Sequence, residues 1–149
     1  INRGGFDTHG NNFPALRAHG EVMDPALASL IEDLAESGML KKTLILMLSE
    51  FGRTPFTQTG GNKLGTGRDH NMYGFSLWLA GGGVKGGTTY GLTDEIGWKA
   101  ADKPVHWYDF HATVLHLLGL NHKKLTFNYA GRDFRLTDVH GNVAKEILA

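Results

Sequence analysis

Two short, predominantly apolar runs place the strongest constraint on how this chain can fold. Residues 43–48 read Thr-Leu-Ile-Leu-Met-Leu, and residues 75–80 read Phe-Ser-Leu-Trp-Leu-Ala. A strand with one face in water alternates between polar and apolar residues, and neither run shows this alternation. A strand covered on both faces, as in a parallel sheet between helices, has this uninterrupted pattern. Both runs are therefore predicted to be buried strands.

Helices are predicted on either side of these strands. Asp24 and Pro25 match an N-cap followed by proline at the first helical position, and apolar residues recur at helical spacing through residues 27–34. An extension of this helix back to residue 16 is left open. Gly38 is a natural residue just beyond the helix end. A second helix is predicted over residues 108–118.

The order of these elements favours an α/β fold, namely a portion of a doubly wound, mostly parallel sheet flanked by helices. Three shorter elements are also predicted: a small hairpin near residues 88–90, a strand or hairpin within 125–134, and a terminal amphipathic turn over 143–148. In open parallel sheets, ligands bind beyond the carboxyl ends of the strands. The polar residues after position 48 and those at 7–12 are placed to serve that edge.

Composition excludes several classes of function. Fifteen basic residues balance 15 acidic ones, so no basic field favours nucleic acid. The absence of cysteine excludes disulfides and thiolate catalysis. The apolar runs are far shorter than the ~20 residues of a membrane span, and no signal peptide is visible. The unusual features of the composition are its 21 glycines and 8 histidines, and the glycines cluster beside histidines and acidic residues. This clustering indicates a site built on loops.

The first cluster contains Asp7 and His9, followed by Asn11. A carboxylate and an imidazole two residues apart can reach one divalent cation, and this donor pair suits Zn²⁺ or Mn²⁺. The alternative is a turn in which Asp and Asn bind nearby backbone and His9 is simply exposed.

Two further clusters flank the predicted strands. Glu50 follows the first strand, where ligands gather, and the fixed fork of donors on Arg53 suits an anionic substrate. The alternative is a surface Glu–Arg pair of little energetic value. Arg68, Asp69 and His70 follow a glycine-rich connector at residues 60–67, and the carboxylate either orients the imidazole or is a second ligand. A solvated loop is the alternative there.

The late histidines form a weaker group. His106 and Asp109 lie near the start of the second predicted helix and are the more plausible site residues among them. Asp109 also fits a charge favoured by the helix dipole. His111 and His116 are five residues apart and share no helical face. His116 and His122 are interpreted as structural or exposed.

Several motifs follow one another along the chain: Gly-Gly-Phe-Asp-Thr-His-Gly-Asn-Asn, Ser-Glu-Phe-Gly-Arg-Thr-Pro, Gly-Arg-Asp-His-Asn, Leu-Ala-Gly-Gly-Gly-Val-Lys-Gly-Gly, Tyr-Gly-x-Thr-Asp-Glu, Asp-Phe-His-Ala-Thr-Val-Leu-His-Leu-Leu-Gly and Gly-Arg-Asp-Phe-Arg-Leu-Thr-Asp-Val-His-Gly. Together they resemble the carboxyl-terminal part of the sulfatase-like "domain of unknown function fifteen-oh-one" family. That family is placed in the alkaline phosphatase superfamily, whose members have a doubly wound α/β fold and usually a two-metal site that cleaves phosphate or sulfate esters.

The resemblance implies roles for individual residues. Asp7 and His9 resemble the Asp/His metal-binding pair of the superfamily, and His70 resembles its late metal-binding His. Asp69 lies beside that His and, with Asn11 and His106, is expected to support the metal ligands from behind.

The resemblance also shows two departures. Glu50 takes the place of the Asp in a metal-binding Asp-His dipeptide, but Phe51 stands where the His belongs and cannot bind a metal. The early Asp and the nucleophile of the superfamily pattern would lie before Ile1. Residues 1–149 are therefore read as the carboxyl-terminal portion of one alkaline-phosphatase-like hydrolase domain, with an amino-terminal part missing. Arg53 or Arg68 is expected to stabilise charge on the transferred group.

These observations predict a metal-dependent hydrolase acting on a small anionic sulfate or phosphate ester. The expected cofactor is a divalent cation, namely Zn²⁺, Mn²⁺ or Ca²⁺, and the resemblance implies export. Two alternatives stay open: a binding or scaffold domain that keeps the fold but has lost hydrolysis, and a carbohydrate binder that uses Trp78, Trp98 and Trp107.

Overall fold

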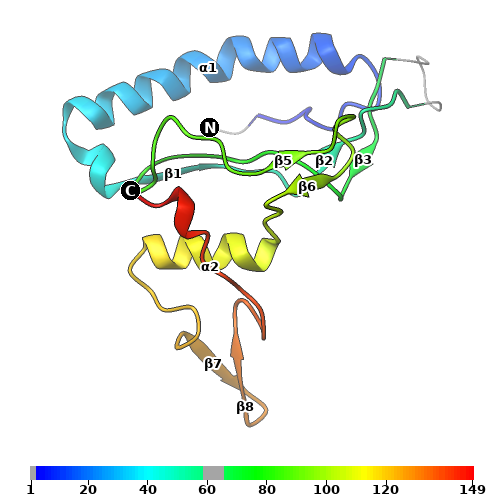
Figure 1. Ribbon diagram of the computed structural model, residues 1–149. Coiled ribbons are helices and arrows are strands. Elements are labelled where there is room, and N and C mark those ends of the chain that lie inside the picture. The colour runs from blue at the N-terminus through cyan, green and yellow to red at the C-terminus, as the bar shows by residue number, and fades with distance from the viewer. Residues whose placement is uncertain (1–2, 59–65) are drawn as a thin grey trace.

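The computed structural model describes residues 3–58 and 66–149 of the chain (Figure 1). The long helix α1 (Asn12–Glu36) lies along one side of a layer of short strands, and α2 (Trp107–Leu117) lies on the other side. A hairpin of β7 (Thr126–Tyr129) and β8 (Arg132–Arg135) projects away from both. Most of the predicted glycine-rich connector, residues 60–65, lies outside the described residues.

Helix α1 is twice as long as the predicted 25–36 segment, and Pro25 lies inside it rather than at its start. The extension to residue 16, which the sequence left open, is present, and the helix continues beyond it to Asn12. Ala15, His19 and Met23 are half-buried, and their spacing of four residues continues the apolar stripe on the same helical face. We infer that this packing offsets the ~3 kcal/mol cost of an interior proline. The end is as predicted, because Gly38 adopts a φ of 69° just beyond the last turn.

The predicted doubly wound, mostly parallel sheet is wrong. Strand β1 (Leu44–Met47) pairs antiparallel with β4 (Trp78–Gly81), and Leu44 lies opposite Gly81. The described residues form four two-stranded sheets, each of them antiparallel. Parallel neighbours need a crossover, usually a helix, and the described residues between β1 and β4 contain none.

The same strands are not buried on both faces as predicted. Met47 is 48% exposed and Trp78 is 39% exposed. An uninterrupted apolar run of this length therefore marks a strand correctly but does not report how its faces are covered.

Between β1 and β4 the chain forms a two-stranded ribbon that carries the site. Strand β2 (Gly52–Arg53) pairs antiparallel with β3 (His70–Asn71), so that Arg53 lies opposite His70. Side chains of directly opposed residues lie on one face of a ribbon. The pairing thus brings together the guanidinium of Arg53 and the imidazole of His70, which are 17 residues apart in the sequence.

The remaining elements agree in part with the sequence. The predicted hairpin within 125–134 is confirmed, and its two-residue turn at Ala130 and Gly131 has φ values of 49° and 78°, as a tight type I′ turn requires. The small hairpin predicted near 88–90 lies later, where β5 (Leu92–Thr93) pairs with β6 (Ala100–Asp102). The terminal turn is a short 3₁₀ helix, η2 (Lys145–Ile147), and another, η1 (Met39–Lys42), precedes β1.

Helix α2 begins and ends one residue before its predicted bounds. Phe110, Ala112 and Thr113 on this helix are buried and form much of the small core. Leu118, the last residue of the predicted helix, is 60% exposed just beyond the observed helix end.

A close crossing of two segments positions the N-terminal loop against the ribbon. The Asn12 amide donates to the Thr66 carbonyl at 2.8 Å, and the Arg68 amide donates to the Thr8 carbonyl at 3.4 Å. Gly67 lies between these bonds, and a Cβ atom there would come within 2.1 Å of the His9 carbonyl oxygen. Only glycine fits at this crossing.

Substitution Gly67→Ala is therefore expected to destabilise the fold by about 1–3 kcal/mol, the usual cost of overpacking. Gly10→Ala is the matched control, because a Cβ atom at Gly10 meets nothing within 4 Å, and it should change stability by less than about 0.5 kcal/mol. Urea unfolding followed by circular dichroism measures both, and equal stability of the two variants would contradict the crossing.

Candidate metal centre

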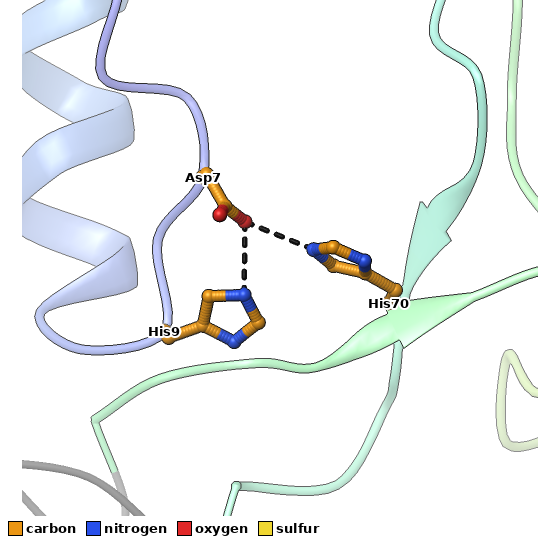
Figure 2. Close-up of side chains that lie close together, drawn as sticks. All are labelled: Asp7, His9 and His70. Atoms are coloured by element: carbon orange, nitrogen blue, oxygen red, sulfur yellow. Dashed lines mark hydrogen bonds and ion pairs between the residues drawn. The ribbon is translucent and has the colours of Figure 1, made fainter.

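Three of the four predicted metal ligands meet at one carboxylate oxygen (Figure 2). The His70 Nε2 atom lies 2.9 Å from Asp7 Oδ1, and the His9 Nε2 atom lies 3.0 Å from the same oxygen. Asp7 and His9 come from the loop before α1, whereas His70 comes from β3. These donor atoms all lie within 4.8 Å of one another.

Arg53 is the third group that contacts this oxygen. Its guanidinium donates to Asp7 Oδ1 and to the Phe6 carbonyl, both at 3.0 Å, and to the Arg68 carbonyl at 3.2 Å. These three bonds join the N-terminal loop to both strands of the ribbon. Arg53 therefore fixes the position of the carboxylate toward which the imidazoles point.

The electrostatic environment keeps Asp7 ionised. The hydrogen bond from His70 is the largest cause, and the hydrogen bond from Arg53 follows, so that the pKa of Asp7 falls from 3.8 to about 2. The side chain is 66% exposed, so solvent screens these interactions and their energy is small. The carboxylate is a negatively charged ligand at every physiological pH.

The second ring nitrogen of His9 also has a partner. His9 Nδ1 lies 2.8 Å from Gln58 Oε1. When Nδ1–H donates to this amide oxygen, Nε2 carries a free lone pair directed toward Asp7 and His70. Metal-binding histidines are held in this way by a carbonyl or carboxylate behind the ring.

Aromatic contacts fix the other imidazole. The Phe51 ring stacks on His70 with centroids 4.0 Å apart, and the His9 and His70 rings lie 4.9 Å apart. Phe51 therefore supports a ligand of the cluster, although it cannot be a ligand itself. The departure noted in the sequence has a structural role here.

The donor set fits one divalent cation. Donor atoms ~3 Å apart match neighbouring ligands about 2.1 Å from a shared ion. Two imidazoles and one carboxylate suit Zn²⁺, Mn²⁺ or Fe²⁺, whereas Ca²⁺ prefers an all-oxygen set. Of the three predicted cations, Zn²⁺ and Mn²⁺ thus agree with the residues present.

A family model described as "Protein of unknown function (DUF1501)" matches residues 1–148. The chain belongs to this DUF1501 family. Searches of curated proteins and of solved structures found no match. Among the described helices of this DUF1501 chain, none is long and apolar enough to cross a bilayer. The family's description assigns no activity, so function must be inferred from the site.

The other predicted site residues of this DUF1501 chain lie around the cluster or away from it. Glu50 is exposed and makes no hydrogen bond or ion pair with the three described ligands. The Arg68 guanidinium lies 5.0 Å from the Phe13 ring centroid rather than at Asp7. Asn11 precedes α1, and its backbone amide donates to the Thr66 hydroxyl at 3.1 Å. His106 caps α2, which Figure 1 shows apart from β3.

Asp69 contacts both histidines of the cluster, and its expected role behind metal ligands stays a prediction. Its Oδ1 accepts the His70 amide hydrogen at 2.8 Å and lies 3.9 Å from His9 Nδ1. Gln58 is the residue that sequence reasoning missed. It lies just before the glycine-rich connector and is the single glutamine of the sequence, but no spacing or motif connects it with His9.

The lowered pKa of Asp7 can be measured in the metal-free protein. Because the pKa is lower in the folded state than the unfolded value of 3.8, the ionised carboxylate stabilises the fold fully above that pH. This contribution is lost as the pH falls through about 2. Arg53→Gln should raise the pKa of the Asp7 carboxyl toward 3.8, as measured by a carbon-13 NMR titration. Arg68→Gln removes a cation that does not contact Asp7 and should leave this pKa unchanged.

Proposed function

We propose that Asp7, His9 and His70 bind one divalent cation and that this centre belongs to a metal-dependent hydrolase of sulfate or phosphate esters. The convergence of both Nε2 atoms on one carboxylate oxygen carries the proposal, because His70 is 63 residues from Asp7 in the chain. The order of motifs, which resembles sulfatase-like proteins, supports the choice of ester hydrolysis. Export, which the same resemblance implies, stays a prediction.

A bare hydrogen-bonded cluster is the simplest alternative to a metal site. In that case each ring donates Nε2–H to Asp7, and His9 Nδ1 must accept a hydrogen bond if the ring is neutral, whereas a protonated ring donates from both nitrogens. The atom 2.8 Å from His9 Nδ1 is, however, the amide oxygen of Gln58, which only accepts. For a neutral His9 ring, this contact favours the tautomer whose Nε2 lone pair is free to bind a cation.

The residues of the chain would divide the work of hydrolysis. A bound divalent cation supplies Lewis acidity toward an ester oxygen and lowers the pKa of a nucleophile. Arg53 holds the Asp7 carboxylate in place and, as a half-buried guanidinium, offers positive charge where negative charge develops on a transferred phosphate or sulfate group. Arg68, the other predicted candidate, lies against Phe13 instead.

The proposal assigns no nucleophile to this chain. The hydroxyl of Thr8 donates to the Asn12 side chain, and the hydroxyl of Ser49 donates to the Phe51 carbonyl at 2.7 Å. Both are held away from the three ligands by these bonds. A metal-binding domain without hydrolysis is therefore the second candidate function, and this engagement of both hydroxyls is the observation that favours it.

The tryptophans give little support to the carbohydrate-binding alternative. Trp107 packs against Phe75, with centroids 5.5 Å apart, on α2. Trp98 contacts Phe56 and Tyr73 instead, with centroids 5.7 and 5.5 Å apart. Within the described residues, Trp98 and Trp107 thus lie in separate ring contacts rather than on one platform.

Metal binding is the direct test of the centre. The chain should bind about one equivalent of Zn²⁺ or Mn²⁺ in titration calorimetry after treatment with a chelator. Asp7→Ala and His70→Ala should each lose this binding. His116→Ala, which removes an exposed imidazole outside the cluster, should bind as the unchanged chain does. Wild-type metal affinity in both ligand variants would refute the centre.

Hydrolysis is tested separately on the longest natural polypeptide that contains this chain. Release of nitrophenol from nitrophenyl sulfate or nitrophenyl phosphate should require the metal and should fall at least about 100-fold in Asp7→Ala. Metal binding without turnover of either ester would instead select the non-catalytic function.

Gln58 is expected to tune metal affinity without contacting the ion. Gln58→Leu removes the acceptor behind His9 and should weaken Zn²⁺ binding by about 10–100-fold, as loss of such a partner typically does. Gln58→Glu restores an acceptor oxygen and should bind at least as tightly as the unchanged chain. Equal affinities in all three proteins, measured by competition with a fluorescent chelator, would show that the His9–Gln58 contact is incidental.

A further inference from the structure

A second site lies at the start of α2, in a part of the molecule that the metal centre does not use. An open cleft of about 540 Å³ is lined there by residues of α2, of the segment before the β7–β8 hairpin, of β8 and of the turn that follows it. This volume is in the usual range of 300–1,000 Å³ for small-molecule sites. The residues that define its chemistry are His106, Tyr108, Asp109, Lys123, Arg135 and Asn142.

The cleft is built on a closely packed base. Gly141 is buried with a φ of 101°, and a Cβ atom there would come within 3.2 Å of His122, Thr137 and Ala112. His122 Nδ1 lies 2.9 Å from the Thr137 hydroxyl, and both side chains are buried. The turn after β8 is therefore held against α2, which fixes the wall of the cleft opposite the helix.

The charges that line the cleft are unbalanced. Within the part of the chain that the structure describes, the side chains of Lys123 and Arg135 make no ion pair or hydrogen bond. Asp109 is the carboxylate among the lining residues, and its Oδ1 already accepts two bonds from Asn142, at 2.7 and 3.2 Å. Lys123 and Arg135 thus line the cleft without an ion-pair partner among the described residues, while the Asp109 carboxylate is hydrogen-bonded to Asn142.

The neutral groups of the cleft are also donors. His106 Nδ1 accepts the Tyr108 amide hydrogen at 3.3 Å, so the proton of the neutral ring is on Nε2. The Tyr108 ring stacks on His106 and on His140, with centroids 5.0 and 5.1 Å apart. The amides in the first turn of α2 add partial positive charge at the same place.

We propose that this cleft binds a phosphate or sulfate group, either as the free oxyanion or as the charged end of a small ester. The guanidinium of Arg135 and the ammonium of Lys123 supply the charge, and His106 and Tyr108 supply hydrogen-bond donors. The volume exceeds that of a bare oxyanion and leaves room for an organic group. The site is independent of the metal centre and does not rest on the hydrolase assignment.

The test measures anion binding to the metal-free chain by ¹H–¹⁵N NMR, with inorganic phosphate, inorganic sulfate and phenyl phosphate as probes. Saturable shifts are expected at the amides of Tyr108 and Asn142. A combined Lys123→Gln, Arg135→Gln variant should weaken binding by about tenfold or more. The control combines Lys124→Gln with Arg132→Gln, which removes two exposed cations outside the lining, and should bind within about twofold of the unchanged chain.

Each outcome decides the proposal. Tighter binding of phenyl phosphate than of phosphate identifies an ester as the ligand, and equal binding identifies the free oxyanion. Absence of saturable shifts at millimolar concentrations of all three probes would overturn the site. Equal weakening in both double variants would overturn it as well, since general charge would then explain the binding. Retained folding is checked by the Gly141 and Thr137 amide shifts, and Arg135→Lys, which keeps the charge, should bind more tightly than Arg135→Gln.

Discussion

The N-terminal part of this structure depends on the polar contacts made at one oxygen of the Asp7 carboxylate. One oxygen atom has His9, His70 and Arg53 within 3.0 Å. These partners come from the N-terminal loop and from both strands of the β2–β3 ribbon. The ribbon is two residues long on each side, so its backbone hydrogen bonds alone hold it weakly. The side chains that meet at Asp7 supply the further contacts that set its position.

Steric fit at two glycines makes this arrangement accessible. Gly67 lets the segment before β3 pass against the His9 carbonyl, and Gly52 lets β2 pass within contact distance of the Gly74 carbonyl. At each place a methyl group would overlap backbone atoms. The glycine excess of the sequence is thus partly explained by close approach of backbones around the candidate metal centre, rather than by loop flexibility alone.

The sequence predicted local features better than it predicted pairing. Helix α2, the β7–β8 hairpin and the end of α1 were placed closely, because spacing and the conformational freedom of glycine are properties of neighbouring residues. The parallel sheet was wrong, because strand direction depends on the connection. The 26 residues between the two apolar runs, 49–74, lack a helical pattern in the sequence, and that absence was the available sign against a parallel crossover.

The site followed the same rule. Asp7, His9 and His70 were identifiable because carboxylates and imidazoles near glycines are unusual enough to be noticed. Glu50 was misleading, since it follows a strand as predicted but makes no bond to the three ligands. Gln58 could not be found, because an amide that orients an imidazole leaves no spacing in the sequence.

The proposed centre has a mechanical consequence for a chain without cysteine. A cation bound by His9 and His70 would close a loop of about 60 residues, but, unlike a covalent disulfide, it would be held by the folded chain and not by the unfolded one. Metal affinity and folding free energy would then be coupled. Cells that control the supply of the ion would thereby control how firmly the N-terminal loop is fastened to the rest of the protein.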